Sequence, residues 1–189
     1  MTIKKASEIP TIDVNLVTIQ EEGEGKDEYI LDTASQIQVE PQIEEEEGVK
    51  LVVKGVLKAQ KLGTQTLTGN KITLTDNVFT PELVQMLQGG SLTTGVDHAI
   101  TGYTPPVAGS NERGKIFTLK AYSAQYNAAG VIVRYECIAY PNCQGVPVAF
   151  NSEDGTFRAP EYTINSAPDI GEAPYTITYV DTLPTAASV

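Results

Sequence analysis

Apolar and polar residues alternate along most of this 189-residue chain, a pattern typical of β-strands with one buried face. The clearest run covers residues 49–59 and predicts one long, half-buried strand. Its apolar face is expected to hold Val49, Leu51, Val53, Leu57 and Ala59, with Lys50, Lys54 and Lys58 opposite. Gly69-Asn70 then predicts a tight turn between two strands of a hairpin. Further strands are predicted at 12–17, 29–39, 117–122, 131–139, 144–151, 156–164 and 174–180, with a short one near Ile100.

One segment has helical rather than alternating periodicity: residues 80–90, TPELVQMLQGG. Thr80 suits the N-cap, Pro81 suits the first helical position, and Gly89 and Gly90 permit the left-handed turn that ends a helix. The apolar stripe of this helix consists of Leu83, Val84, Met86 and Leu87. The stripe either packs in the core, which we favour, or contacts another subunit.

Three polar stretches, near 20–28, 41–48 and 91–112, are predicted to be extended loops of a single domain spanning residues 1–189. Pro41 is expected to end the preceding strand, and repulsion among Glu44, Glu45, Glu46 and Glu47 favours an open conformation. With about nine to eleven strands, one helix and no repeat of fixed period, the predicted fold is mainly β. We expect a β-sandwich or barrel with one flanking helix at about 80–89.

Composition and charge limit the classes of function that the chain is expected to have. The net charge of −11 would repel a phosphate backbone, so specific nucleic-acid binding is not expected. No apolar run reaches the roughly 20 residues of a membrane span, and the first residues lack a secretory signal, which predicts synthesis in the cytoplasm without a membrane partner. Cys137 and Cys143 are too few for a disulfide framework and are expected to be reduced thiols.

The sequence offers little support for a catalytic or a metal-binding function. His98 follows Asp97, but adjacent residues of an extended segment point in opposite directions, so the carboxylate is poorly placed to orient the ring. No G-x-S-x-G elbow occurs, and the acidic clusters lack the ligand spacing of an EF-hand loop. We expect no enzyme activity, catalytic residue, cofactor or metal.

Three segments together resemble the tail tube, or major tail, proteins of long-tailed bacteriophages and phage-derived particles. They are ASQIQVEPQIEEEEGVKLVVKGVLKAQK, ITLTDNVFTPELVQMLQGG and FRAPEYTINSAPDIGEAPYTITYVDTLP, within residues 34–184. The resemblance implies a tail-tube-like β-sandwich or barrel whose copies close into hexameric rings. The rings would stack into a hollow helical tube that conducts DNA during ejection.

The resemblance also implies partners and surfaces. The chain would be a virion structural protein of the tail, made in the host bacterial cytoplasm, contacting its own copies and the tape measure, terminator, baseplate or tip proteins. DNA would pass through the lumen without specific binding. The exposed loops and helix stripe supply the candidate assembly-interface residues Glu21, Glu22, Glu24, Lys26, Glu44, Glu45, Glu46, Glu47, Leu83, Val84, Leu87, Tyr103, Pro105 and Pro106.

One other class of non-enzymatic protein fits the same pattern. A β-sandwich module that binds a receptor or a carbohydrate on a virion or cell surface would have a similar composition. Polymerisation distinguishes the two, because a tube protein forms rings whereas a binding module stays small and saturates with a ligand.

Overall fold

The computed structural model describes residues 10–23, 25–26, 28–96 and 99–186. Within these ranges the chain forms twelve strands and one helix, which confirms the prediction of a mainly β fold with one flanking helix. The elements are β1 (Thr11–Glu21), β2 (Glu28–Leu31), β3 (Ala34–Glu46), β4 (Val49–Val53), β5 (Val56–Lys61), β6 (Thr64–Asp76), α1 (Pro81–Gln88), β7 (Ser91–Thr94), β8 (Ile100–Thr104), β9 (Phe117–Tyr126), β10 (Ile132–Gly145), β11 (Glu161–Ser166) and β12 (Thr176–Val180).

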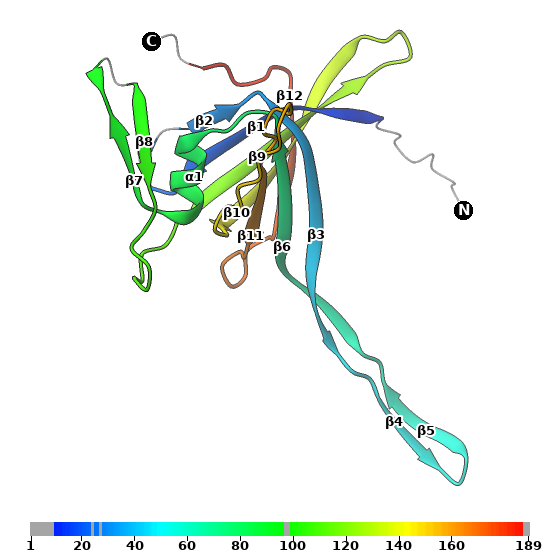
Figure 1. Ribbon diagram of the computed structural model, residues 1–189. Helices are drawn as coiled ribbons and strands as arrows, with labels where there is room; N and C mark the ends of the chain where they lie inside the picture. The colour runs from blue at the N-terminus through cyan, green and yellow to red at the C-terminus, as the bar shows by residue number, and fades with distance from the viewer. Residues whose placement is uncertain (1–9, 24, 27, 97–98, 187–189) are drawn as a thin grey trace.

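Eight strands form one antiparallel sheet in the order β2-β1-β9-β10-β11-β6-β3, and β12 also pairs with β10. Strand β10 is long enough to pair with β12 through residues 135–139 and with β11 through residues 143–145. The sheet therefore divides at β10 and folds over, which brings β1 near β3. The result is the β-sandwich of Figure 1, with the main core between its two halves.

Helix α1 packs onto this core as its apolar stripe predicts. Leu83, Val84 and Leu87 are buried in the same cluster as residues from both halves of the sandwich. The contact is close, because a Cβ on Gly145 of β10 would lie 2.5 Å from the Leu87 Cα. Gly89 ends the helix with φ 82°, as predicted, but Thr80 makes no side-chain capping bond.

The connection from β3 to β6 corrects three sequence predictions. Residues 49–59 are not one strand: β4 and β5 form a hairpin that turns at Lys54 and Gly55, whose φ angles are 49° and 79°. Pro41 does not end its strand, because β3 is an edge strand where a missing N–H is tolerated. Gly69 is not in a turn either. It lies within β6, where a Cβ would come within 2.3 Å of the Ser166 carbonyl oxygen.

The predicted loop at 41–48 is also mostly strand. Residues Glu44, Glu45 and Glu46 belong to β3 and pair with Thr66, Gln65 and Thr64 of β6. Neighbouring side chains of a strand point to opposite faces, which separates adjacent carboxylates and reduces the repulsion expected to open the segment.

The remaining expectations are met in part. The hairpin of β9 and β10 forms with its turn at 127–130, and the strands expected at 156–164 and 174–180 correspond to β11 and β12. The strand expected at 144–151 is absent beyond the end of β10 at Gly145. Most of the predicted loop 91–112 is taken up by a β7–β8 hairpin and the irregular segment that follows it.

Candidate assembly surfaces

The longest exposed feature is a two-stranded arm, residues 40–68, made of the outer parts of β3 and β6 and the β4–β5 hairpin (Figure 1). Every residue of the arm is exposed. We call residues 40–47 with 63–68 its base, and residues 48–62 its tip. From Ile43 to Val52 the arm extends by about 30 Å at roughly 3.3 Å per residue.

The arm carries large apolar side chains that nothing covers within the described part of the subunit. Cross-strand pairing puts Val49, Leu51, Val53, Val56 and Ala59 on one face of the tip; Lys58 is the extra residue at a register shift. Val52 and Leu57 pair on the other face. The prediction that Leu57 shares a face with Val49 and Leu51 is therefore wrong. Val49 is 67% exposed and Leu51 56%, values far from those of a core strand. An isolated two-stranded hairpin is marginally stable in water, and an exposed apolar surface of this size is typical of an interaction site.

The four glutamates of the base lie on the exterior. Glu46 forms an ion pair with Lys61 and accepts a hydrogen bond from Thr64 (3.3 Å), and Glu45 accepts one from Gln65 Nε2 at 2.6 Å. Glu44 and Glu47 are exposed and enter no ion pair in the described ranges. Glu44 and Glu47 therefore remain available to a neighbouring molecule, whereas Glu45 and Glu46 are exposed but already bonded within the arm.

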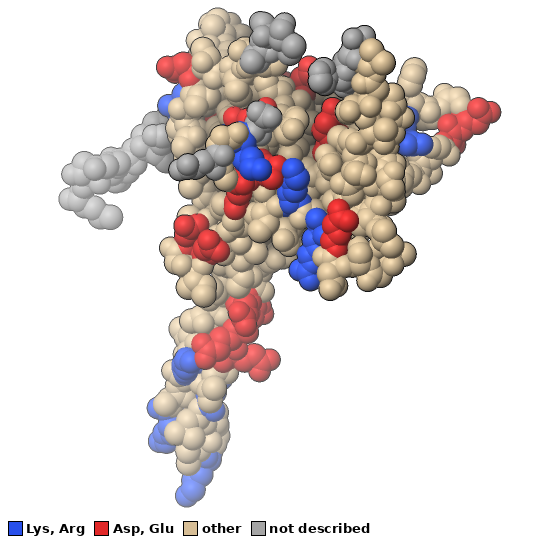
Figure 2. Space-filling view, turned by 90° about the vertical axis from the view of Figure 1, so that its left-hand side faces the viewer, with Lys and Arg blue, Asp and Glu red and all other residues tan. Residues whose placement is uncertain are grey.

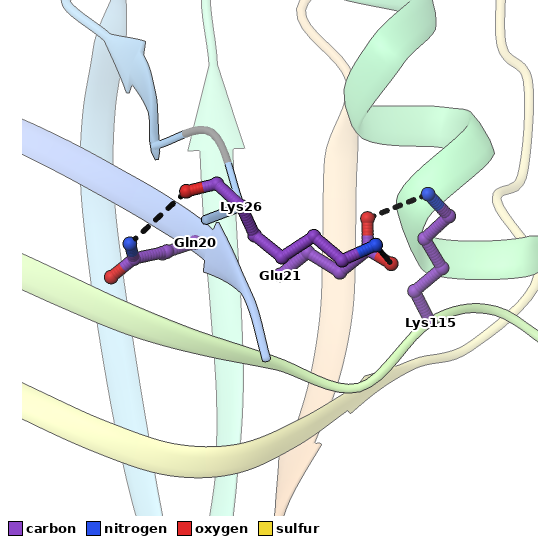
Figure 3. Close-up of polar contacts among 4 residues, drawn as sticks. All are labelled: Gln20, Glu21, Lys26 and Lys115. Atoms are coloured by element: carbon purple, nitrogen blue, oxygen red, sulfur yellow. Dashed lines mark hydrogen bonds and ion pairs between the residues drawn. The ribbon is translucent and has the colours of Figure 1, made fainter. Parts of the chain in front are cut away.

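The described carboxylates of the acidic segment at 20–28 are bonded within the chain instead. The Glu21 carboxylate accepts hydrogen bonds from Lys26 Nζ at 3.1 Å and from Lys115 Nζ at 2.6 Å. Figure 3 shows both contacts. These two hydrogen bonds, from Lys115 first and Lys26 second, lower the pKa of Glu21 below its ordinary value. Glu22 accepts the Asn142 backbone N–H at 3.1 Å. Glu24 lies outside the described residues.

Glu28, at the start of β2, completes this arrangement. It accepts hydrogen bonds from Thr18 Oγ1 at 2.6 Å and Lys120 Nζ at 3.0 Å. Desolvation raises its pKa, but the two hydrogen bonds and the positive charge of Lys120 together outweigh it, so the pKa is lowered. The segment therefore links β1, β2 and β9 and differs from the free loop that its composition predicted.

The helix stripe and the third predicted loop are also engaged internally. Leu83, Val84 and Leu87 are buried in the core, so these interface candidates belong to the subunit interior. The Tyr103 hydroxyl donates to the Gly89 carbonyl at 2.8 Å and accepts from Gln88 Nε2 at 2.8 Å. It thereby ties β8 to the end of α1. Beyond it, Pro105 is exposed and Pro106 is half-buried, so only Pro105 of this group presents an open surface.

Chemical sites are not evident in the described ranges. No group of three or more His, Cys, Asp or Glu side chains is arranged there to hold a metal ion, and His98 with Asp97 lies outside them. Cys137 and Cys143 are buried and unbridged, as expected, and burial raises the pKa of Cys143 to about 12. No helix in these ranges has the length and apolar character that a membrane crossing requires.

Comparison with known proteins adds no family. No protein-family model matches the chain, and a search of curated proteins returned no match. The tip residues of the arm, 48–62, were not among the interface candidates predicted from the sequence. The signal was Lys54-Gly55 between two short apolar runs, which is compatible with a two-residue hairpin turn.

Proposed function

We propose that this chain is a structural subunit of a bacteriophage or phage-like tail tube. Its copies form hexameric rings that stack into a hollow tube, and DNA passes through the tube without specific binding. The rings contact other tail proteins at the two ends of the tube. The resemblance of residues 34–184 to tail tube proteins supports this assignment.

The observation that carries the proposal is the exposed arm. Residues 40–68 extend beyond the sandwich with large apolar side chains on both faces of the tip. Apolar surface of this kind marks an interaction site in a soluble protein. In an assembly of identical copies each arm is covered by a neighbour, which removes the exposed apolar surface from water.

Negative-stain electron microscopy of the purified full-length protein tests the proposal. We expect six-fold rings or hollow tubes whose number rises with protein concentration. Uniform single subunits at every concentration and salt would contradict it and would favour a binding module.

A shortened-arm variant is the matched control. Glu46 pairs with Thr64, so residues 47–63 can be replaced by an Asn-Gly turn that closes the ribbon at that pair. Circular dichroism should show that the shortened protein still folds as β-structure, and microscopy should show no tubes. Tubes formed by the folded variant would show that the arm is not needed for assembly.

A further inference from the structure

Charge is segregated along the arm. Glu44, Glu45, Glu46 and Glu47 lie at its base, whereas residues 48–75 contain no acidic residue. The tip carries the lysines Lys50, Lys54, Lys58 and Lys61. Figure 2 shows the two regions as a red base and a blue tip. The tip is thus a cationic projection from a chain whose net charge is −11.

Most of these charges are uncompensated within the subunit. Lys61 and Glu46 form the ion pair at the boundary between tip and base. Lys50, Lys54 and Lys58 form no ion pair in the described ranges, and the same holds for Glu44 and Glu47. The tip therefore offers positive charge, and the base negative charge, to another molecule.

At both the tip and the base an apolar pair adjoins a charge, which lies on the sandwich side of the pair at the tip and on its outer side at the base. On one face of the tip, Val52 pairs with Leu57 and the next cross-strand pair on that face contains Lys50. On one face of the base, Ile43 pairs with Leu67 and the next such pair contains Glu45. Each surface thus presents two exposed apolar side chains beside one charge, and the two charges have opposite signs.

We propose that the cationic tip of one arm docks against the acidic base of the arm of a neighbouring copy. The inference rests on the proposed tube and adds the pair of surfaces that join its subunits. A second copy is the partner because the chain itself supplies the complementary charge and apolar pair. Parallel arms displaced by about 30 Å, the length of roughly nine strand residues, place Val52 beside Ile43 and Lys54 beside Glu45. Such a head-to-tail contact is heterologous, so it propagates from copy to copy.

Charge reversal at the tip tests the contact. The variant Lys50→Glu, Lys54→Glu, Lys58→Glu changes the net charge by 3 × 2 = 6, from −11 to −17. We expect the protein concentration needed for tube formation to rise about tenfold or more, since exposed ion pairs are individually weak and three are reversed together. An unchanged assembly concentration would overturn the inference.

A charge swap separates the contact from net charge. Adding Glu44→Lys, Glu45→Lys and Glu47→Lys returns the net charge to −11 and restores opposite signs between tip and base. The control adds Glu153→Lys, Asp154→Lys and Glu172→Lys instead, three exposed acids outside the arm, and has the same net charge. Assembly should recover in the swap and stay impaired in the control. Recovery in both, or in neither, would overturn the inference, while tubes of the unmodified protein would still support the proposed function.

A cysteine cross-link gives a readout that does not depend on the charge variants. The double variant Lys54→Cys, Glu45→Cys should form a ladder of covalent oligomers when assembled protein is oxidised. The pair Lys54→Cys, Glu153→Cys should give no ladder, and neither should Lys54→Cys alone. Ladders of equal intensity in both double variants would contradict tip-to-base docking. If the unmodified protein forms no tubes at all, the proposed function fails first and the docking fails with it.

Discussion

Strand β6 contains the tripeptide Thr-Leu-Thr twice, and the two occurrences have different environments. Thr66-Leu67-Thr68 lies in the arm and Thr73-Leu74-Thr75 lies in the sandwich. Leu67 is 37% exposed, whereas Leu74 is fully buried. Both segments pair with β3, but only residues 70–75 also pair with β11. Pairing with the third strand, β11, and not the local sequence, determines which of the two tripeptides lies in the core.

Strand β6 therefore takes part in two kinds of β-structure. In the sandwich, apolar side chains are buried by strands that arrive from distant parts of the chain. In the arm, the same alternation leaves both faces of a two-stranded ribbon in water. The sandwich therefore stabilises the subunit, and the arm is expected to contribute to subunit stability only slightly.

The largest expected effect comes from truncating the two leucines. Leu74→Ala should lower the free energy of unfolding by about 2–5 kcal/mol, because it leaves a cavity in the core. Leu67→Ala removes the same atoms from an exposed site and should change it by less than about 0.5 kcal/mol. Urea unfolding of the unassembled subunit measures both. Equal losses would show that the arm folds as part of the core.

A smaller loss is expected at the inner end of β6. Asp76 is fully buried, and its Oδ1 accepts hydrogen bonds from Thr33 Oγ1 at 2.5 Å and from the Val78 N–H at 3.3 Å. Asp76→Ala should therefore cost about 1–3 kcal/mol of unfolding free energy. Asp154→Ala, at an exposed turn, is the control and should be near neutral. Equal effects of the two variants would contradict the structural role of Asp76.

A third test concerns the ion pairs of Glu21, which lie on the surface of the sandwich. Glu21→Gln should lower the free energy of unfolding by less than about 1 kcal/mol, because such pairs are largely solvated. The folded-state pKa of Glu21 is lowered, so its contribution is complete above the ordinary value of 4.5. It is lost as the pH falls through the folded-state pKa. The difference between the two proteins should vanish there, and a difference that grows in acid would refute this account.

The smallest effect on subunit stability is expected from the arm itself. Replacing residues 47–63 by Asn-Gly should change the free energy of unfolding by no more than about 0.5 kcal/mol, since no core contact is removed and the closed loop becomes shorter. The same variant should lose tube formation completely. Urea unfolding measures the stability of the variant and microscopy its assembly. A large loss of stability alongside the loss of tubes would contradict this expectation.

Local patterns predicted the parts of the fold that depend on near neighbours. Alternation located most strands, and the Asn127–Gly130 turn joined β9 to β10 as expected. The helix formed at its predicted residues with its stripe in the core. Pairings between distant segments were not predictable in this way. Nothing local shows that β11 covers only the inner half of β6, and Gly69 allows close approach to Ser166 although its neighbour Asn70 made it resemble a turn.

The candidate surfaces show the same limit. Composition marked residues 20–28 as a free loop, but Lys115 and Lys120, far along the chain, bind its carboxylates. The helix stripe was correctly favoured as core. The arm tip was missed because Val49 and Leu51 have the residue types of a buried strand, and exposure is decided by whether another part of the chain arrives to cover them.

The two cysteines have a practical consequence for labelling. Both are buried and unbridged, and burial holds the pKa of the Cys143 thiol at about 12, so its reactive thiolate is scarce at neutral pH. The natural protein should consequently react slowly with maleimides or iodoacetamide while it stays folded. A fluorophore attached to one engineered surface cysteine would then report its position against little background, and late reaction of the native thiols would mark unfolding.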